Sequence, residues 1–293
     1  MLSHAAFCSR QTRDQLEVLV IDHPLFDAEI LLQGAQLIRF NPKGQDNWFW
    51  LSDKIAYHRG KALRGGIPIC WPWFGNADKN PPAVKNAILQ KDAHGFARSL
   101  PWQISDLQET AHGVQVELSL HSSPVSHVFW PHDFHLRAVF ILGKDCQLKL
   151  HTHNTGNKAF AFSQALHSYF PTAAIQQTRI QGFNDVAFID TLENWQEKQQ
   201  NGDILFQGET DRIYLNHPTV VLKTPLYRRE LQGINSRSAV VWNPWIEKSK
   251  RLGQFAHDDY QRMFCVETAN AFSDYKSLQP GQSCEIGLCL SAL

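Results

Sequence analysis

The sequence has no excess of charge of either sign. Its 293 residues include 28 lysines plus arginines and 28 aspartates plus glutamates, and no block of like charge occurs. Proteins that bind nucleic acids or membrane surfaces generally present a basic patch or run. We therefore expect neither a nucleic acid nor a membrane as a partner, and any site for an anion must be built from a few local residues.

Segments that would direct the chain to a membrane are missing as well. No apolar run has the length needed to span a bilayer, and residues 1–20 lack the basic-then-apolar pattern of a signal peptide. The six cysteines are scattered without a CxxC pair, which argues against a zinc ribbon. These absences predict a cytoplasmic protein with reduced thiols.

Two families of enzyme signature are also absent. The sequence contains neither GxGxxG nor GxxxxGK[ST], so nothing in it supports nucleotide binding. It contains no GxSxG element, so nothing supports a serine hydrolase of that type.

Helical periodicity is nearly absent, and alternation with a period of two takes its place. Such alternation is typical of half-buried strands, and many strands without intervening helices indicate an all-β antiparallel sandwich or barrel. We expect a single domain over residues 1–293 with few short helices, one of them at residues 253–262. The predicted strands are 16–22, 113–121, 134–143, 146–154, 178–183, 211–216, 219–224, 238–243, 263–268 and 284–291.

Two irregular segments interrupt this pattern, at residues 65–100 and 121–134. Long loops in a compact domain are usually functional or disordered, and these are too aromatic to be disordered. The first begins within "ALRGGIPICWPWFG" (62–75), where Arg64 precedes two glycines and a run of prolines and aromatic residues. Proline cannot donate to a β ladder, so this stretch is not a plain core strand.

Several of the fourteen histidines could bind a metal ion. His151 and His153 alternate in "LHTHN" and share one face of a strand, so they are either metal ligands or a solvated pair beside a turn. His127, His132 and His135 lie in or next to an irregular, proline-containing segment, where polar loop residues are the simpler interpretation.

Two other histidines lie in aromatic surroundings. His167 in "FSQALHSYFP" is either a satisfied core residue or a functional one. His94 in "DAHGFAR" lies at an expected loop-to-strand transition, where it either caps a turn or belongs to a site.

Three charged residues occur among apolar neighbours. Glu267 in "MFCVETAN" either points outward from an alternating strand or is held in a pocket by donors. Asp211 in "GETDRIYLN" opens a strand, where it either caps the preceding turn or binds a ligand. Arg98 in "HGFARS" either packs its stem on Phe96 at the surface or joins a site.

These motifs, taken together and in order, resemble the aldose 1-epimerase superfamily. The stretches "LRGGIPICWPWFG" and "HGFAR" are followed by "ALHSYF" (165–170), "TDRIY" (210–214), "VVWNPW" (240–245) and "FCVETAN" (264–270), so the resemblance spans most of the chain. More narrowly, the sequence is similar to the hexose-6-phosphate mutarotases (glucose-6-phosphate 1-epimerases). This implies a large antiparallel β-sandwich, the galactose mutarotase-like supersandwich, with a sugar site on one concave face.

The resemblance also implies an activity and a catalytic pair. The protein would be an isomerase that interconverts the α and β anomers of a hexose 6-phosphate, with His167 as general acid and Glu267 as general base. No cofactor or metal ion is implied, and we expect a monomer.

Four further residues match substrate-binding positions of the family. Arg64 and Arg98 match positions that bind the phosphate end, Asp211 matches a residue that holds sugar hydroxyls, and His94 resembles a sugar-contacting histidine. Ala93 departs from the pattern, because some members carry glutamine there. That departure concerns one polar substrate contact and not the chemistry.

The residue types suit the reaction. Ring opening removes a proton from the C1 hydroxyl and gives one to the ring oxygen, and the acid and base exchange roles on closure. A carboxylate is ionised at neutral pH, and histidine has an ordinary pKa near neutrality. Two arginines can grip a phosphate with planar forks, glycines let backbone approach a ligand closely, and prolines and tryptophans stiffen the loop, leaving aromatic faces to pack on the sugar.

Other functions remain open on the sequence alone. A sugar-binding module would keep the aromatic residues and arginines and would not need an acid–base pair. A glycoside hydrolase would need two carboxylates, for which Glu267 and Asp211 are the candidates. A metal-dependent isomerase using His151 and His153 is a further alternative. If the phosphate is not held by Arg64 and Arg98, Lys91 and Arg59 are the next candidates.

Overall fold

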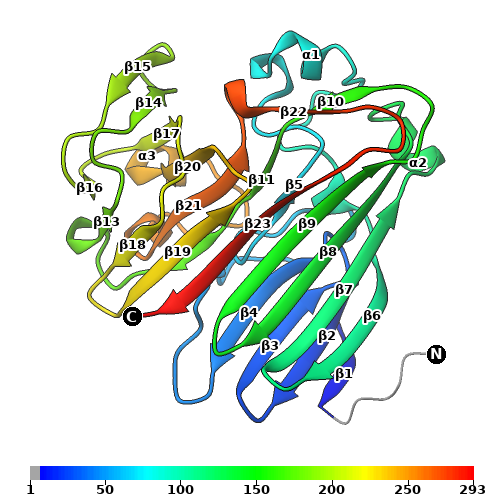
Figure 1. The fold of residues 1–293 in the computed structure, drawn as a ribbon. Coiled ribbons are helices and arrows are strands. Elements are labelled where there is room, and N and C mark those ends of the chain that lie inside the picture. The colour runs from blue at the N-terminus through cyan, green and yellow to red at the C-terminus, as the bar shows by residue number, and fades with distance from the viewer. Residues whose placement is uncertain (1–6) are drawn as a thin grey trace.

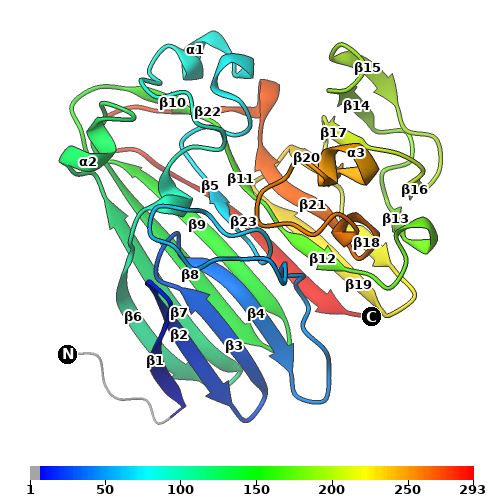
Figure 2. The same cartoon turned by 180° about the vertical axis from the view of Figure 1, so that it is seen from behind.

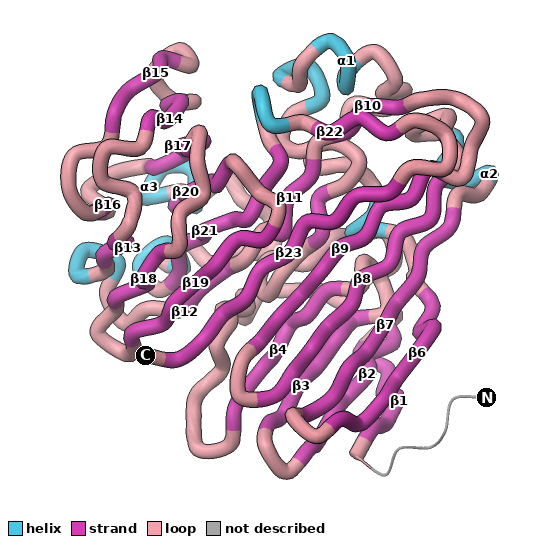
Figure 3. The backbone as a smooth tube through the Cα atoms, viewed as in Figure 1, coloured by secondary structure: helices cyan, strands magenta, loops and turns pink. Residues whose placement is uncertain are grey.

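The computed structural model describes residues 7–293 and is built almost entirely from antiparallel strands (Figures 1 and 3). The expected all-β fold with few short helices is confirmed. The helices are α1 (Pro82–Lys85), α2 (Pro124–His127) and α3 (Trp245–Ser249), with 3-10 turns at Ala77–Lys79, Ala97–Ser99, Ile175–Gln177, Asp259–Gln261 and Phe272–Asp274. The strands are β1 (Cys8–Arg13), β2 (Leu16–His23), β3 (Phe26–Leu31), β4 (Gln36–Pro42), β5 (Ile69–Cys70), β6 (Gln103–Thr110), β7 (Gly113–His121), β8 (Phe134–Gly143), β9 (Cys146–Asn154), β10 (Phe160–Phe162), β11 (Gln164–Leu166), β12 (Tyr169–Pro171), β13 (Arg179–Gln181), β14 (Ala187–Asp190), β15 (Gln196–Gln199), β16 (Ile204–Leu205), β17 (Thr210–Tyr214), β18 (Val220–Lys223), β19 (Arg228–Ile234), β20 (Ser238–Asn243), β21 (Met263–Asn270), β22 (Lys276–Leu278) and β23 (Ser283–Ala292).

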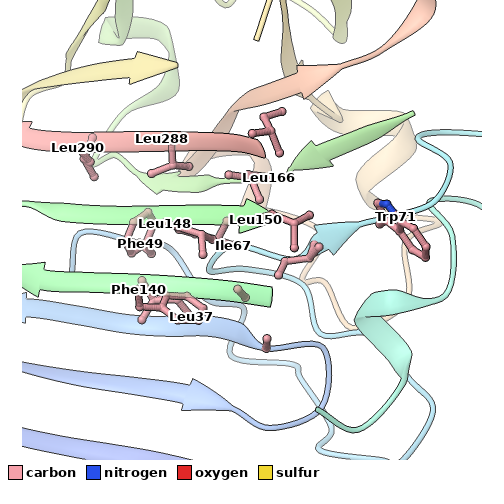
Figure 4. Close-up of a cluster of buried hydrophobic side chains, with 14 of the residues drawn as sticks. Leu37, Phe49, Ile67, Trp71, Phe140, Leu148, Leu150, Leu166, Leu288 and Leu290 are labelled. Carbon is pink, nitrogen blue, oxygen red and sulfur yellow. The ribbon is translucent and has the colours of Figure 1, made fainter. Parts of the chain in front are cut away.

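Two large sheets and a smaller one pack around a shared apolar core. The nine-stranded sheet has the order β16-β13-β18-β19-β23-β9-β8-β7-β6, and the four-stranded sheet β1-β2-β3-β4 lies behind its β6–β9 half (Figures 1 and 2). Figure 4 shows side chains of both sheets meeting in the core, among them Leu37 from β4 with Phe140 and Leu148 from β8 and β9. The alternation of β9 explains its place, because apolar residues such as Leu148 are buried and the polar residues between them are half-exposed.

The eight-stranded sheet carries the polar residues of interest. Its order is β15-β14-β17-β20-β21-β11-β5, with β12 also paired to β21. Every residue of β20 and β21 is buried. Because central strands covered on both faces read as nearly continuous apolar runs, a charged residue such as Glu267 stands out there.

The irregular segment that begins at Gly65 contains short elements but no long strand, as expected. Its glycines play a different part from the one predicted. A Cβ on Gly66 would lie 2.1 Å from the carbonyl oxygen of Leu37, and one on Gly65 would lie 2.5 Å from that of Trp50. Both glycines have positive φ and let two stretches of protein backbone pack together, rather than backbone and ligand.

The two tryptophans of this segment are core residues. Trp71 and Trp73 are fully buried, and Trp71 packs against Trp130 and Phe134. Phe74 is the aromatic residue of this run that reaches the cavity described below. Of the aromatic residues expected to pack on the sugar, Phe74 is therefore the one of this run that is placed to do so.

The expected helix at residues 253–262 is also wrong. Only the 3-10 turn Asp259–Gln261 forms there. The buried Asp259 carboxylate accepts hydrogen bonds from Ala256 N (2.7 Å), Ser52 Oγ (3.1 Å) and Arg262, so side-chain bonds hold this segment in place of a helical ladder. No helix among residues 7–293 is long and apolar enough to cross a membrane.

Thirteen of the strands in residues 7–293 go beyond the predicted set: β1, β3–β6, β10–β12, β14–β16, β19 and β22. The edge strands β1 and β6 are largely polar, so they lack an apolar alternation to detect. A register shift between Glu29 and Ile30 interrupts the pairing of β3 with β4. The shift also interrupts the alternation of buried and exposed side chains along β3.

Candidate active site

A cavity of about 950 Å³ opens over the eight-stranded sheet, and its lining includes all six residues that the sequence singled out. Strands β17, β20 and β21 supply Asp211, Trp242 and Glu267. Arg98 comes from the 3-10 turn Ala97–Ser99, and the other predicted residues, Arg64, His94 and His167, come from loops. The fold thus gathers residues that are up to about two hundred positions apart in the chain.

The floor of the cavity holds a histidine–glutamate pair. Nε2 of His167 lies 3.4 Å from Oε1 of Glu267, and the side chains are 9% and 1% exposed. The outward-facing alternative for Glu267 is therefore wrong. Oε2 of Glu267 and Nδ1 of His167 are buried and have no hydrogen-bond partner among the described residues.

Packing fixes the ring of His167. The residue lies between β11 and β12, and its backbone N–H donates to Pro68 O at 3.0 Å. The imidazole stacks on Tyr169 at 4.8 Å with an angle of 11° between the planes, and Trp242 meets it edge-on at 6.1 Å. These rings leave the Nε2 edge facing Glu267 and hold the imidazole in one orientation.

Burial moves both titrating groups toward their uncharged forms. It raises the pKa of Glu267 well above the ordinary value, with a further increase from the Asp211 carboxylate. It lowers the pKa of His167 to about 3, and the nearby Arg98 guanidinium adds to this effect. Burial therefore favours a neutral imidazole and a protonated carboxyl, which differs from the ionised glutamate expected from the sequence.

His94 is arranged as a hydrogen-bond donor. It has φ of +67°, and its backbone N–H donates to Gly75 O at 2.9 Å while Nδ1 accepts from Gly75 N at 3.3 Å. That bond assigns the ring proton to Nε2. Burial, reinforced by the Arg98 charge, holds the pKa of His94 well below its usual range, so the neutral ring can donate to a sugar oxygen. A 3-10 turn follows it instead of the expected strand.

The two arginines are each anchored by one bond and keep other donors free. Arg64 Nε donates to Gly253 O at 2.8 Å, and Arg98 Nη2 donates to Ala93 O at 2.8 Å. Each guanidinium has five N–H donors. Neither Lys91 nor Arg59 lines the cavity: Lys91 pairs with Asp78 at 3.3 Å, and Arg59 Nε donates to Gln15 O at 3.3 Å.

Three cavity lysines are absent from the sequence prediction: Lys61, Lys79 and Lys248. With Arg64 and Arg98 they give the lining five cationic side chains against two carboxylates, although the whole chain has no net charge. The cavity is therefore locally positive and suits an anionic ligand. Lys248 follows the motif "VVWNPW" by three residues, and the cavity residue Tyr169 follows His167 by two, but neither position was singled out from the sequence.

The other histidine clusters lie away from this cavity. Nε2 of His151 is 3.3 Å from Glu285 Oε2, and Nδ1 of His153 is 2.7 Å from Ser283 Oγ, both on the nine-stranded sheet. His127 pairs with Asp133 at 3.0 Å. Across residues 7–293, no group of three or more His, Cys, Asp or Glu side chains has the geometry to hold a metal ion.

Comparison with known proteins agrees with this geometry. The family model for aldose 1-epimerase matches residues 17–290. The chain belongs to the aldose 1-epimerase family. Proteins of Salmonella typhimurium and Escherichia coli, both named "Putative glucose-6-phosphate 1-epimerase", are each 38% identical, with 90% and 92% of this chain and 86% and 88% of those proteins covered.

Solved structures show the same fold. A crystal structure described as a "putative mutarotase" from Salmonella typhimurium has a TM-score of 0.88 and 33% identity, covering 99% of this chain and 95% of that one. Galactose 1-epimerase from Lactobacillus acidophilus has a TM-score of 0.68 at 13% identity, with 97% of each chain covered, which is a likeness of fold. The expected galactose mutarotase-like sandwich is thereby confirmed.

Proposed function

We propose that this member of the aldose 1-epimerase family is a hexose-6-phosphate mutarotase, which interconverts the α and β anomers of its substrate. The observation that carries the proposal is the His167–Glu267 contact of 3.4 Å at the floor of a cation-rich cavity. Mutarotation needs one acid and one base within reach of C1 and the ring oxygen, and the pair supplies both. Relatives 38% identical are named for glucose 6-phosphate, which supports this substrate class.

The pair holds one exchangeable proton. In the proposed reaction Glu267 accepts the proton of the C1 hydroxyl while His167 gives a proton to the ring oxygen, and the roles reverse on closure. Burial favours the proton on Glu267. A C1 hydroxyl that donates to the unpartnered Oε2 of Glu267 would stabilise the carboxylate, and a ring oxygen near Nε2 would stabilise the protonated imidazole. Substrate binding thus shifts the pair toward an ionised Glu267 and a protonated His167, which are the forms that start the reaction.

The remaining cavity residues bind and orient the sugar. Arg64 and Arg98 have free guanidinium donors for the phosphate. His94 offers Nε2–H, and Asp211 offers a carboxylate for sugar hydroxyls. The reaction breaks and forms one C–O bond by proton transfer, so it needs no cofactor.

The alternatives are less well supported. A non-catalytic sugar-binding module has no use for a buried acid–base contact whose outer atoms, Nδ1 and Oε2, lack partners. A glycoside hydrolase needs two carboxyl groups flanking one bond. Glu267 instead contacts His167, and Asp211 is engaged by Lys248 at 3.5 Å.

We further propose that residues 1–293 work as one domain and that the protein is cytoplasmic. The largest apolar cluster contains residues from Leu19 to Leu290, which supports a single folding unit. All six cysteines are free thiols, which suits a reducing compartment. We infer that a monomer suffices for activity, because every site residue comes from one chain.

Polarimetry on freshly dissolved α-glucose 6-phosphate tests the function. The proposal predicts that optical rotation reaches equilibrium faster in proportion to protein concentration. A rate equal to the spontaneous one at every protein concentration would overturn it.

A further inference from the structure

Lys248 lies in the cavity without a part in the chemistry described above. It belongs to α3, which leaves the end of β20 and lies beside β17 and β20 (Figure 2). Its Nζ is 3.1 Å from Glu209 Oε1 and 3.5 Å from Asp211 Oδ2, and it sits 5.8 Å from the centre of the Trp242 ring. A single ammonium group is therefore shared by two carboxylates and one aromatic face.

The chain fixes this position through a fully buried asparagine. Asn243 Nδ2 donates to Tyr260 O at 2.9 Å and to Met263 O at 2.8 Å, and Asn243 Oδ1 accepts from Trp245 N at 2.9 Å. These bonds set the direction in which the chain leaves β20 and enters α3. Ser249 Oγ then donates to Trp245 O and closes the short helix. Lys248 is thus carried toward the cavity by a rigid turn rather than by a free loop.

The groups beneath Lys248 are paired across the sheet. Asp211 on β17 lies directly opposite Trp242 on β20, and both line the cavity. Glu267 lies opposite Val240, one strand further and two residues along. Asp211 thus stands at the edge of the catalytic floor, where a carboxylate meets the hydroxyl groups of a ring bound over the histidine–glutamate pair.

Without a neighbouring cation, burial would favour the protonated, uncharged form of Asp211. Burial raises the pKa of Asp211, Glu209 adds to the rise, and the Lys248 ammonium opposes both. Asp211 in turn is the charged neighbour that raises the pKa of Glu267. The ammonium balances negative charge on the cavity residue Asp211 and on its neighbour Glu209, which lies outside the lining.

We propose that Lys248 is a positioning residue, which holds the Asp211 carboxylate against Trp242 as an acceptor for substrate hydroxyl groups and so contributes to recognition of the sugar ring. This inference rests on the proposed function, because it assigns a part to Asp211 in binding the same substrate. It differs from a direct contact of Lys248 with the phosphate. A loss of affinity for both glucose and glucose 6-phosphate indicates that Lys248 positions Asp211. A loss for glucose 6-phosphate alone indicates a direct contact with the phosphate.

The test compares Lys248→Met with Lys250→Met in mutarotation of glucose 6-phosphate and of glucose. Lys250 is a matched control at the C-cap of the same helix, since its ammonium pairs with Glu247 at 2.6 Å and lies outside the cavity lining. A positioning role predicts that Lys248→Met raises KM for both sugars by about tenfold, the scale of one hydrogen bond to a charged group, with a smaller change in kcat. Lys248→Arg should recover most of the loss, and Lys250→Met should change neither constant.

The second measurement tests whether Lys248 and Asp211 act together. Because Lys248 acts through that carboxylate, Lys248→Met in an Asp211→Asn background should add less than about a twofold further loss. The acid limb of the KM profile should also move to higher pH in Lys248→Met, since the charge opposing the burial of Asp211 beside Glu209 and Glu267 is gone. Lys248→Gln serves the same comparison if the methionine variant does not fold.

Three results would overturn the inference. A loss confined to glucose 6-phosphate would make Lys248 a phosphate ligand. Full additivity with Asp211→Asn would show that the two residues act independently. Unchanged constants with a lower melting temperature would leave Lys248 a purely structural residue. If the wild type fails to accelerate either sugar, the proposed function itself fails, and dissociation constants for glucose measured by NMR titration of the same variants still decide the part of Lys248.

Discussion

His167 Nε2 and Glu267 Oε1 lie 3.4 Å apart, although a hundred residues separate them in the chain. The contact arises because β21 pairs with both β11 and β12, the two short strands that flank His167. Sheet pairing therefore places the acid and the base without help from any flexible segment. Each of the following predictions depends on that placement or on the residues around it.

Removing either member of the pair should abolish most of the turnover. Glu267→Gln keeps an oxygen for His167 but cannot take a proton, and His167→Ala removes the other transfer group. Each should lower kcat by at least about 100-fold, with a smaller effect on KM. The measurement is steady-state polarimetry, with His153→Ala as control, because His153 lies on the nine-stranded sheet outside the cavity. Near-normal kcat in either variant would show that its assigned role is wrong.

The arginines should distinguish a phosphosugar from a plain sugar. Arg64→Ala removes a charged donor from the phosphate, and such bonds are worth about 1.5–3 kcal/mol, so kcat/KM for glucose 6-phosphate should fall by roughly 10–100-fold. The phosphate does not change during ring opening, so the loss should appear in KM, and the rate with glucose should barely move. Arg98→Ala should show the same selectivity. Lys91→Ala, which affects an exposed residue outside the cavity, is the control.

Arg98 should also influence the pKa of His167, and Arg64 should do so to a lesser degree. Its guanidinium is the charge that most lowers the pKa of His167. Arg98→Ala should therefore move the apparent pKa of the histidine upward from about 3, read from the acid limb of the kcat profile between pH 3 and pH 7. A profile identical to that of the wild type would place the guanidinium charge too far from the pair to matter.

For the selectivity between the two sugars, the contradicting result is an equal loss for glucose and glucose 6-phosphate in both arginine variants. That result would make the arginines structural residues.

Stability should depend on pH through Glu267. A raised pKa means that the folded protein keeps a proton over a range where the unfolded chain has released it, so stability falls as pH rises from the ordinary carboxyl pKa of 4.5 toward the folded value. Glu267→Gln has no such loss. The melting temperature of this variant relative to wild type should therefore be higher at pH 8 than at pH 5, by at least about 2 °C. The same difference at both pH values would contradict the raised pKa.

Gly66 should be intolerant of a methyl group. Its φ is +60°, and a Cβ would lie 2.1 Å from Leu37 O, so Gly66→Ala should cost at least about 3 kcal/mol of unfolding free energy. Gly60 has φ of +75° with nothing within 4 Å, so Gly60→Ala should cost only the backbone strain of about 1 kcal/mol. Urea denaturation of both variants measures the difference. Equal costs would show that the close approach to Leu37 is relieved by a small shift.

Some site residues are prominent in the sequence because they interrupt the local pattern, and the resemblance of the motifs to the family supplied their roles. Glu267 is a charge in a strand buried on both faces, and Arg64 stands alone before an aromatic loop. Lys248 gives no such signal, since it lies among the charged residues of "WIEKSKR", and only the buried Asn243 turn brings it to the cavity. The pKa shifts were also beyond prediction, because they depend on burial by segments distant in sequence.

Strands were predictable where apolar and polar residues alternate regularly, and they were missed where this alternation is absent. Strand β9 alternates over its whole length and β8 over its first half, and both were predicted with their bounds. Which aromatic residue of the loop reaches the site could not be predicted, because a sequence shows that an aromatic residue is near a site but not which way it points. Trp71 turns to the core and Phe74 to the cavity, three residues apart.

The central claim is that this cavity catalyses exchange between anomers of a hexose 6-phosphate by means of His167 and Glu267. The most direct measurement is two-dimensional NMR exchange spectroscopy on glucose 6-phosphate at anomeric equilibrium, with wild type and with Glu267→Gln. We predict cross-peaks between the α and β anomeric protons that grow in proportion to wild-type concentration and that vanish in the variant, which still binds the sugar. Exchange no faster than in buffer with the wild type, or equally fast with Glu267→Gln, would contradict the account.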